Sequence, residues 1–168
     1  MAGRHPKSAR VNLAAVRPAS VSDLKKVAKL WSRLDEFHRG LGLDIPRTSG
    51  AAAKWVASFE RTLGRFSFLW VAEDGGRVVG FALARIKQAP AIYGGGLIGE
   101  ISDIYIDDSA RGRGLAGKLA DVALAGLRSA GALSVEVQVI TGNEAGLKFW
   151  ESQGFQVRLR QLTKAFRR

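Results

Sequence analysis

The residues with the clearest potential for chemistry are those of segment 111–117, Arg-Gly-Arg-Gly-Leu-Ala-Gly. They follow a strand-like run and begin an amphipathic helix. Backbone N–H groups at a helix start have no partner within the helix, and the helix dipole adds partial positive charge there. Glycine lets another molecule approach the backbone closely. The segment therefore predicts a pyrophosphate-binding loop that acts mainly through backbone N–H groups. Its members are Arg111, Gly112, Arg113, Gly114, Leu115, Ala116 and Gly117.

Three motifs fit these letters. Gly112–Gly117 spells G-x-G-x-x-G, the dinucleotide fingerprint, and Glu136 stands where its ribose-binding acid is expected. That fingerprint usually begins its domain, however, and roughly 100 residues precede it here. Gly112–Lys118 spells G-x-x-x-x-G-K, but a P-loop needs Ser or Thr next for Mg²⁺, and this chain has Leu119. The third motif is R-x-x-G-x-A, which Arg111–Ala116 forms.

The flanking segments favour the third motif. A β-branched and aromatic run predicts a strand before the loop, and apolar residues at helical spacing predict a helix after it. An alternating run follows, then a short helix that Asn143 can cap and Gly154 can close, and a last strand from Phe155. In residue numbers, these predicted elements are a strand over 97–107, a helix from 115 to Gly131, a strand over 133–139, a helix over 144–153, and the final strand.

The run Asn143–Phe155, NEAGLKFWESQGF, resembles the second signature of the GNAT superfamily of acyl-CoA N-acyltransferases, and Arg111–Ala116 resembles the first. The resemblance is clear over Ile98–Phe155. It implies acetyl-CoA as the donor, with the loop at the pyrophosphate. It also implies that the backbone of Ile104, Tyr105 and Ile106 pairs with the pantetheine arm, and that Asn143 contacts this arm.

The preceding residues complete the predicted fold. Residues 1–10 are expected to be a basic mobile tail, and residues 11–168 one domain. The expected elements before the loop are a strand over 11–16, a helix from Ser20 or Ser22 to Gly40, a helix over 51–63, and strands over 67–73 and 77–88 joined at Gly75-Gly76. The predicted class is α/β with a mixed sheet, in the order β-α-α-β-β-β-α-β-α-β, which matches the GNAT fold.

N-acylation requires a neutral amine, and an ammonium of pKa about 10.4 is neutral in only about one part in 10³ at pH 7. A base or a water chain must remove its proton. Glu100 is the first candidate, because its position resembles the base glutamate of histone-acetylating GNATs, and Asp103 is the second. Trp150 stands where many members carry a Tyr acid, so the usual proton donor to the CoA thiolate is missing.

Composition excludes several classes of protein. The 168 residues contain no cysteine, which excludes disulfides, thiolate metal sites and a Cys-acyl intermediate. Two histidines without ligand spacing argue against a metal site. No apolar run reaches the roughly 18 residues of a membrane span, so we expect no membrane partner. The expected localisation is cytoplasmic.

The net charge of +11 includes eight cations in segments 1–10 and 156–168, which hold no acid. This keeps open an alternative, a non-catalytic CoA-binding or basic nucleic-acid-binding module on the same fold. The favoured function is transfer of an acetyl group from acetyl-CoA directly to a primary amine of a small molecule or peptide. Loops 37–50 and 89–96 are expected to select the acceptor. A homodimer is possible.

Overall fold

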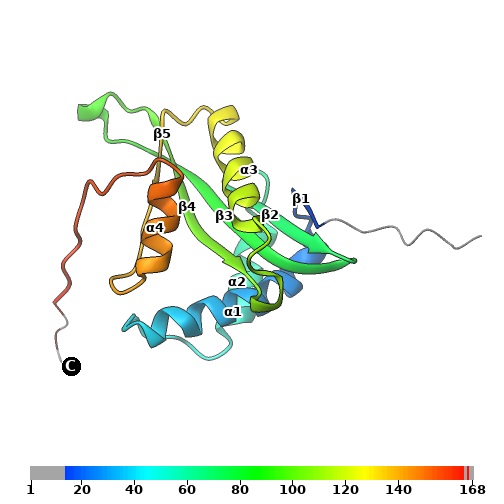
Figure 1. The fold of residues 1–168 in the computed structure, drawn as a ribbon. Helices are drawn as coiled ribbons and strands as arrows, with labels where there is room; N and C mark the ends of the chain where they lie inside the picture. The colour runs from blue at the N-terminus through cyan, green and yellow to red at the C-terminus, as the bar shows by residue number, and fades with distance from the viewer. Residues whose placement is uncertain (1–13, 165, 167–168) are drawn as a thin grey trace, which may run out of the picture. The chain divides into compact units, whose positions relative to one another are not determined.

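A computed structural model of the chain describes residues 14–164 and 166. The chain forms two compact units, which divide between Gln138 and Val139. The first unit holds the sheet and three α-helices, and the second holds one helix and the segment after it (Figure 1). The basic tail expected at residues 1–10 lies outside the described residues.

The elements follow the predicted order through the last helix. They are β1 (Ala15–Pro18), η1 (Val21–Asp23), α1 (Leu24–Gly40), α2 (Ala51–Glu60), β2 (Ser67–Asp74), β3 (Arg77–Gln88), η2 (Ala91–Tyr93), β4 (Leu97–Ile106), η3 (Asp108–Ala110), α3 (Leu115–Ser129), β5 (Ser134–Val137) and α4 (Glu144–Ser152). Strand β1 ends two residues later than expected, at Pro18, which an edge strand tolerates because its outer N–H needs no partner.

The five strands form one mixed sheet in the order β1-β2-β3-β4-β5. The first three pairings are antiparallel, and β4 pairs with β5 in parallel. Helices α1 and α2 cover one face of the sheet, and α3 covers the other (Figure 1). The predicted α/β class with a mixed sheet is confirmed.

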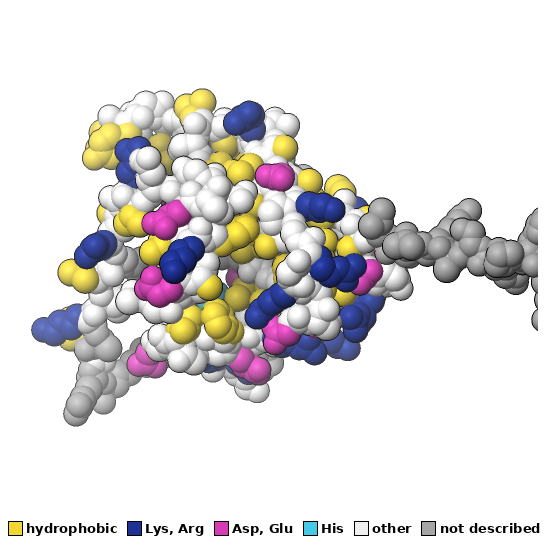
Figure 2. Space-filling view, viewed as in Figure 1, with side chains coloured by type: hydrophobic (Ala, Val, Ile, Leu, Met, Phe, Trp, Pro, Cys, Tyr) yellow, Lys and Arg dark blue, Asp and Glu magenta, His cyan; other side chains and the backbone are white. Residues whose placement is uncertain are grey.

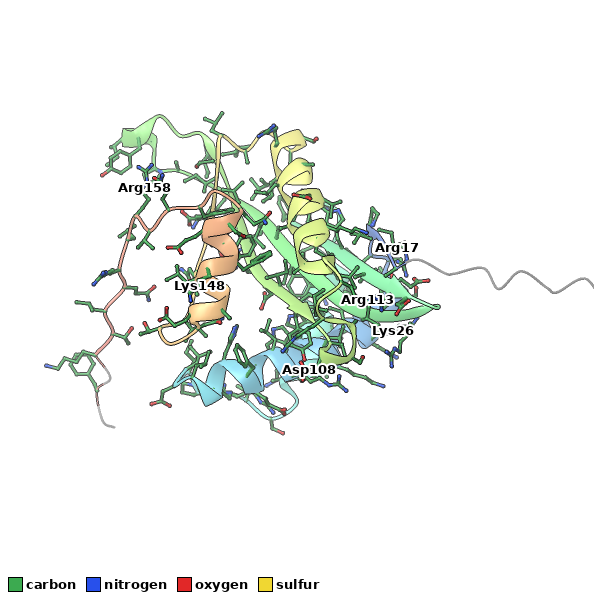
Figure 3. The ribbon with its side chains drawn as sticks, viewed as in Figure 1. Arg17, Lys26, Asp108, Arg113, Lys148 and Arg158 are labelled. Carbon is green, nitrogen blue, oxygen red and sulfur yellow. The ribbon has the colours of Figure 1, made fainter. Side chains whose placement is uncertain are left out.

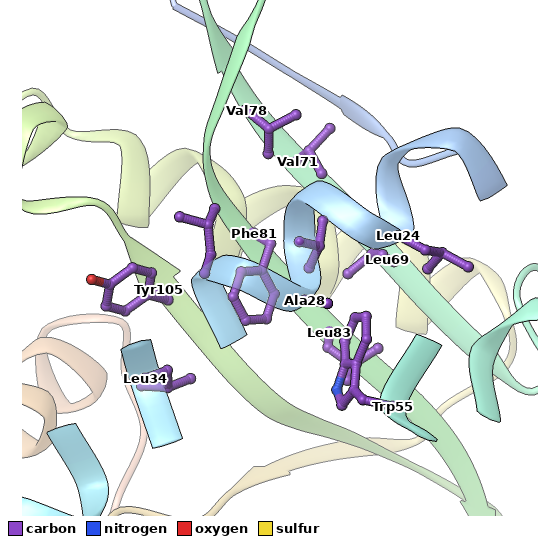
Figure 4. Packing of buried hydrophobic residues seen from close by; sticks show 12 residues of the cluster. Leu24, Ala28, Leu34, Trp55, Leu69, Val71, Val78, Phe81, Leu83 and Tyr105 are labelled. Carbon is purple, nitrogen blue, oxygen red and sulfur yellow. The ribbon is translucent and has the colours of Figure 1, made fainter. Parts of the chain in front are cut away.

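The core on the α1 and α2 side follows from the apolar spacing of α1. Leu24, Val27, Leu30 and Leu34 recur at helical spacing and are all buried. They pack on the side chains that β2, β3 and β4 turn toward this face, among them Phe81 (Figure 4). Burial of such a side chain contributes about 1.5–3 kcal/mol, so this face holds α1 firmly on the sheet.

The packing of α3 on the other face of the sheet combines buried apolar residues with a close contact at a glycine. Leu119, Ala123 and Leu127 of α3 are fully buried. At Gly126, a Cβ atom would lie 2.5 Å from Cζ2 of Trp70 on β2. Glycine here allows the helix to approach the tryptophan ring closely, at some cost in helix propensity. The helix that begins at the predicted loop is thereby fixed against the centre of the sheet.

A buried carboxylate anchors the start of α1. Asp23 lies 2.8 Å from the Arg17 guanidinium of β1 and accepts a 2.9 Å hydrogen bond from the backbone N–H of Ser20. Arg17 also pairs with Glu73 of β2 at 2.7 Å. The hydrogen bond from Arg17 holds the pKa of Asp23 below its usual range against the effect of burial. One network thus joins two strands to the first helix.

We expect Asp23→Asn to lower the free energy of unfolding at pH 7 by about 1–3 kcal/mol, because charge-assisted hydrogen bonds are lost. The lowered pKa makes Asp23 stabilising above its unfolded-state value of about 3.9, and this stabilisation disappears as the pH falls. The gap between the urea midpoints of the two proteins should therefore narrow as the pH falls below about 4. A gap between the midpoints that is independent of pH would contradict this assignment.

The strand predicted from Phe155 is wrong, because residues 156–164 form no strand in the structure. Their alternating Val157 and Leu159 are typical of a strand, but both side chains are exposed. Alternation of apolar and polar residues makes a segment suitable for a sheet edge. The segment becomes a strand only where a neighbouring strand is available to pair with it. Within residues 14–164 and 166, no helix is long and apolar enough to cross a membrane, and no group of three or more potential ligands marks a metal site.

Candidate active site

The predicted loop is an array of unpaired N–H groups. Gly112 and Gly114 adopt φ values of +73° and +71°, which are left-handed conformations that suit glycine. Among the described residues, the N–H groups of 112–114 have no acceptor, and those of 115–117 begin α3 without a side-chain cap. A Cβ atom at Gly112, Gly114 or Gly117 would have nothing within 4 Å. The loop therefore presents donors and open space together, as an anion site requires.

The arginines of the loop are held by the protein itself. Arg113, which is labelled in Figure 3, pairs with Asp74 of the β2–β3 hairpin at 2.7 Å. Arg111 pairs with Asp108 at 2.8 Å, donates to the Ile106 carbonyl at 3.2 Å, and lies over the Tyr105 ring. These contacts fix the loop geometry, so the backbone N–H groups remain the main donors toward a ligand.

The turn before the loop is built by Asp107. Its carboxylate accepts a hydrogen bond from the Ser109 N–H at 3.1 Å and one from the Ser109 hydroxyl at 2.7 Å. Arg33 of α1 donates to the same carboxylate. Hydrogen bonds from Ser109 hold the pKa of Asp107 below its usual value. Asp107 thus shapes the turn and joins it to α1.

Strand β4 contains one extra residue. Leu83 of β3 pairs with Asp103, but the next residue, Ala84, pairs with Ile101. Ser102 therefore has no partner and forms a β-bulge. In a regular strand, Glu100 and Asp103 would point to opposite faces. The bulge brings them to the same face, the one that α1 and α2 cover.

Glu100 is enclosed by cations. Its carboxylate lies 2.6 Å from Arg85 and 3.1 Å from Lys87, and its side chain is 8% exposed. Burial raises the pKa of Glu100, but the hydrogen bonds from Arg85 and Lys87 outweigh it, so the pKa lies below its usual value. Glu136 of β5, directly across from Glu100, is a second partner of Lys87. A carboxylate held in its charged form in this way accepts a proton weakly.

Asp103 has the opposite environment. Burial raises its pKa above the usual value, and the hydrogen bond from Ser102 opposes this in part. That bond, from the Ser102 hydroxyl to the Asp103 carboxylate, measures 2.8 Å. The charge of Glu100 also raises the pKa of Asp103. A carboxylate with a raised pKa is the stronger base of the two.

The edge of β4 beyond the bulge is open toward β5. The parallel pairing ends at Ile101 and Val137, so among the paired strands of the sheet none flanks 102–106 on that side. An open strand edge presents backbone N–H and C=O groups to an added extended group. Ile104, Tyr105 and Ile106, the residues expected to pair with a pantetheine arm, lie on this edge.

The model of the Acetyltransferase (GNAT) family matches residues 30–155. The chain belongs to the GNAT acetyltransferase family. A relative, glucosamine 6-phosphate N-acetyltransferase from Trypanosoma brucei brucei, is 31% identical over 148 residues, which cover 88% of this chain and 92% of that protein.

Two further similarities are consistent with the family. A mycothiol acetyltransferase from Thermomonospora curvata is 34% identical over 87 residues, which cover 52% of this chain and 27% of that protein. A solved structure, described as a "predicted acetyltransferase with acetyl-CoA" from Clostridium acetobutylicum, has a TM-score of 0.76 at 17% identity and covers 91% of this chain and 96% of its own. The latter supports the fold.

In this GNAT acetyltransferase, the loop expected to select the acceptor borders a hollow. The hollow measures about 400 Å³ and is lined by α1, α2 and the segment between them. Its lining includes Trp31, Arg47, Thr48 and Ser49, and Arg47 also pairs with Asp35 at 2.8 Å. The aromatic ring, the hydroxyls and the guanidinium offer contacts for a polar acceptor.

The second unit of the acetyltransferase contains the second signature. Asn143 caps α4, accepting a 2.9 Å hydrogen bond from the N–H of Gly146. A Cβ atom at Gly146 would lie 2.5 Å from Asn143 Nδ2, so glycine leaves room for the capping side chain. The cap predicted from the sequence is confirmed, and the contact of Asn143 with the pantetheine arm stays a prediction.

Trp150 is buried, with 6% of its surface exposed, and lies edge-on to Phe149 and Phe155 at centroid distances of 4.9 and 5.1 Å. We expect Trp150→Ala to lower the free energy of unfolding by about 3–5 kcal/mol, because it leaves a cavity. Trp150→Phe should keep most activity, since the position acts by packing. Chemical denaturation and the rate of thiol release check the two effects.

If Trp150 acts by packing alone, a tyrosine there should add no ionisation. The CoA thiol has a pKa close to that of cysteine, about 8.5, so its thiolate leaves without an acid. Trp150→Tyr would disprove this if it were at least tenfold faster, with a new ionisation near pH 9–10, about the pKa of tyrosine.

Sequence reasoning missed Ser102, Arg85 and Lys87. The bulge at Ser102 had a signal, because Ile101 and Ile104 are three residues apart where a regular strand repeats every two. The cations around Glu100 had none, because their meeting depends on the pairing of β3 with β4.

Proposed function

We propose that the protein transfers the acetyl group of acetyl-CoA directly to the primary amine of a small molecule. The observation that carries the proposal is the loop at 112–117, whose unpaired N–H groups precede α3 beside an open strand edge. In the reaction of this family, the amine attacks the thioester carbonyl of acetyl-CoA, and CoA thiolate leaves. No acyl-enzyme is needed, and the chain has no cysteine to form one.

Asp103 is the proposed base. Glu100, the first candidate from the sequence, is proposed to hold the side chains of Arg85 and Lys87 in place. The raised pKa of Asp103 suits proton removal, whereas Arg85 and Lys87 keep Glu100 charged. Removal of the proton from an acceptor ammonium gives the neutral nitrogen that attacks the thioester. We expect backbone N–H groups at the open edge of β4 to bind the oxyanion that develops.

An amino sugar phosphate is the first acceptor to test, because the relative that the chain matches over 92% of its length is named for glucosamine 6-phosphate. A phosphate-bearing acceptor also suits the basic chain. The alternative is a CoA-binding or nucleic-acid-binding module without catalysis, which the basic termini favour.

The deciding experiment is an acceptor panel with acetyl-CoA, scored by thiol release and by the mass of the product. Glucosamine 6-phosphate, glucosamine, an aminoglycoside and peptides with free α-amino groups should be included. Product formation with any amine supports the proposal, and rates identify the class. Absence of release across the panel, together with salt-sensitive binding to RNA or DNA, would favour the non-catalytic alternative.

A further inference from the structure

The hydroxyl of Ser102 lies against the carboxylate of Asp103. Ser102 is the extra residue of the β4 bulge, so no residue of β3 pairs with it. Its Oγ donates a hydrogen bond to Asp103 Oδ2 at 2.8 Å, whereas the Leu83 carbonyl oxygen, its other acceptor, is 3.5 Å away. The shorter distance is typical of a hydroxyl that donates to oxygen, and a charged acceptor strengthens such a bond. The carboxylate is therefore the main partner of this hydroxyl.

This hydrogen bond distinguishes the two oxygens of the Asp103 carboxylate. In the part of the chain that the structure describes, Oδ1 accepts no hydrogen bond. The side-chain torsion that turns an aspartate carboxylate is broad, so a carboxylate without a fixed donor adopts many orientations. The Ser102 hydroxyl therefore holds Oδ2 and leaves Oδ1 available to accept a proton.

The pair of Ser102 and Asp103 lies where β5 separates from β4. The last paired residues are Ile101 and Val137, so Ser102 is the first residue of β4 beyond this pairing, and its side chain is exposed. The strand residues expected to pair with the pantetheine arm, 104–106, follow directly. The hydroxyl is thus placed beside the expected path of the acetyl donor.

We propose that Ser102 is a positioning residue of the transfer reaction, which orients the Asp103 carboxylate so that Oδ1 receives the proton of the acceptor. The inference rests on the proposed function, in which Asp103 is the base. In this step the N–H bond of the acceptor ammonium breaks, its electron pair stays on nitrogen, and the proton moves to Oδ1. Ser102 keeps its own proton and acts through Asp103.

Loss of the hydroxyl changes the proton affinity of Asp103 in one direction. Burial raises the pKa of Asp103, the hydrogen bond from Ser102 lowers it, and the charges of Arg85 on β3 and Glu100 on β4 lower and raise it respectively. Elements α1, α3 and β5 also pack against β4, but none of their described charged side chains shifts this pKa. The pKa of Asp103 should therefore be higher without the Ser102 hydroxyl.

Two substitutions separate the hydroxyl from the rest of the residue. Ser102→Ala removes the hydroxyl, and Ser102→Thr keeps it on a β-branched side chain that suits a strand. Both change an exposed side chain, so circular dichroism and the rise in Tm with acetyl-CoA should be unchanged.

The first measurement is an NMR titration of the aspartate carboxyl carbons, with Asp103 assigned as the signal absent from Asp103→Asn. Figure 2 shows Asp and Glu side chains scattered over one face of the molecule, so a residue-specific measurement is needed. We expect Ser102→Ala to move the titration midpoint of Asp103 to higher pH and Ser102→Thr to keep it. An unchanged midpoint in Ser102→Ala, or a threonine variant that behaves like it, overturns the proposal.

Ser109→Ala is the matched control. The Ser109 hydroxyl donates to the Asp107 carboxylate at 2.7 Å, and this bond holds the pKa of Asp107 below its usual value. The substitution should raise the midpoint of Asp107 and leave that of Asp103 in place. A shift of Asp103 in Ser109→Ala as large as that in Ser102→Ala would show a general effect and overturn the assignment.

The second measurement is kinetic and uses acetyl-CoA with the fastest amine of the acceptor panel. Ser102→Ala should lower kcat about tenfold above the acidic limb, because misplacement by 1 Å can cost about 10²-fold. It should move the acidic limb to higher pH and change the KM of the amine little, and Ser102→Thr should restore both. A raised KM with unchanged kcat overturns the positioning role.

The two measurements fail separately. If no amine of the panel is acetylated, the proposed function fails, and the role of Ser102 in it fails too. If an amine is acetylated but the Asp103 midpoint does not respond to Ser102→Ala, the proposed function stands and the positioning role alone is overturned.

Discussion

Gly114→Glu should abolish the stabilisation by acetyl-CoA. For the unmodified protein, acetyl-CoA at 100 times its Kd adds about 2.7 kcal/mol, which corresponds to a rise in Tm of about 5–11 °C in a chain of this size. NAD and ATP should give no such rise. The introduced carboxylate side chain would fill the open space over the unpaired N–H groups of the loop and place a negative charge where phosphate binds.

The control must separate loss of the site from loss of the fold. Gly64→Glu carries the same strain, because Gly64 has φ +79° and nothing within 4 Å of a Cβ position, and it lies between α2 and β2. It should lower the Tm of the free protein and keep the response to acetyl-CoA. Gly114→Gln has the size of glutamate without its charge and measures the steric part. A full response from Gly114→Glu, or a response to NAD alone, would refute the proposed site.

Asp103→Asn is expected to reduce kcat by about 10²–10⁴, the usual contribution of a general base. Acetyl-CoA should still raise the Tm, since Asp103 is not part of the loop. In the unmodified protein, kcat/KM should fall on acidification as the Asp103 carboxylate takes up a proton, at a pH above the ordinary aspartate value because burial raises its pKa. The asparagine variant should lack this acidic limb.

Glu100→Gln is the matched comparison on the same strand and face. We expect it to change kcat less than Asp103→Asn does and to weaken the fold, since Arg85 and Lys87 lose their buried partner. Because the pKa of Glu100 is lowered, its stabilisation is present above about pH 4.3 and is lost as the pH falls. If Glu100→Gln reduces kcat more than Asp103→Asn, the original assignment of Glu100 as the base is restored.

Most of the fold was predictable because its signals are local. The apolar spacing of α1, the Gly75-Gly76 hairpin and the cap at Asn143 each depend on a few adjacent residues, and each was confirmed. The segment after Phe155 was not, because alternation is local but pairing requires a neighbour from elsewhere. The loop at 111–117 could be predicted because its glycines and the start of the helix are adjacent in the sequence.

The candidate base was less predictable. A position on β4 could be inferred for both carboxylates, but their protonation depends on groups far away in the chain. Arg85 and Lys87 reach Glu100 across a β-ladder, and the desolvation of the half-buried Asp103 depends on packing. The sequence suggests Glu100 as the base because its position resembles that of a known base, whereas the charges and burial around each carboxylate favour Asp103.

The extra residue in β4 has a consequence for how this site can change. Deleting Ser102 would remove the hydroxyl that bonds to the Asp103 carboxylate, and it would also restore a regular repeat and send Glu100 and Asp103 to opposite faces of the sheet. The geometry of the site thus depends on how many residues β4 contains, and not only on which residues they are. A substitution at Ser102 changes one hydrogen bond to Asp103, whereas an insertion or deletion there changes which face of the sheet each acid occupies.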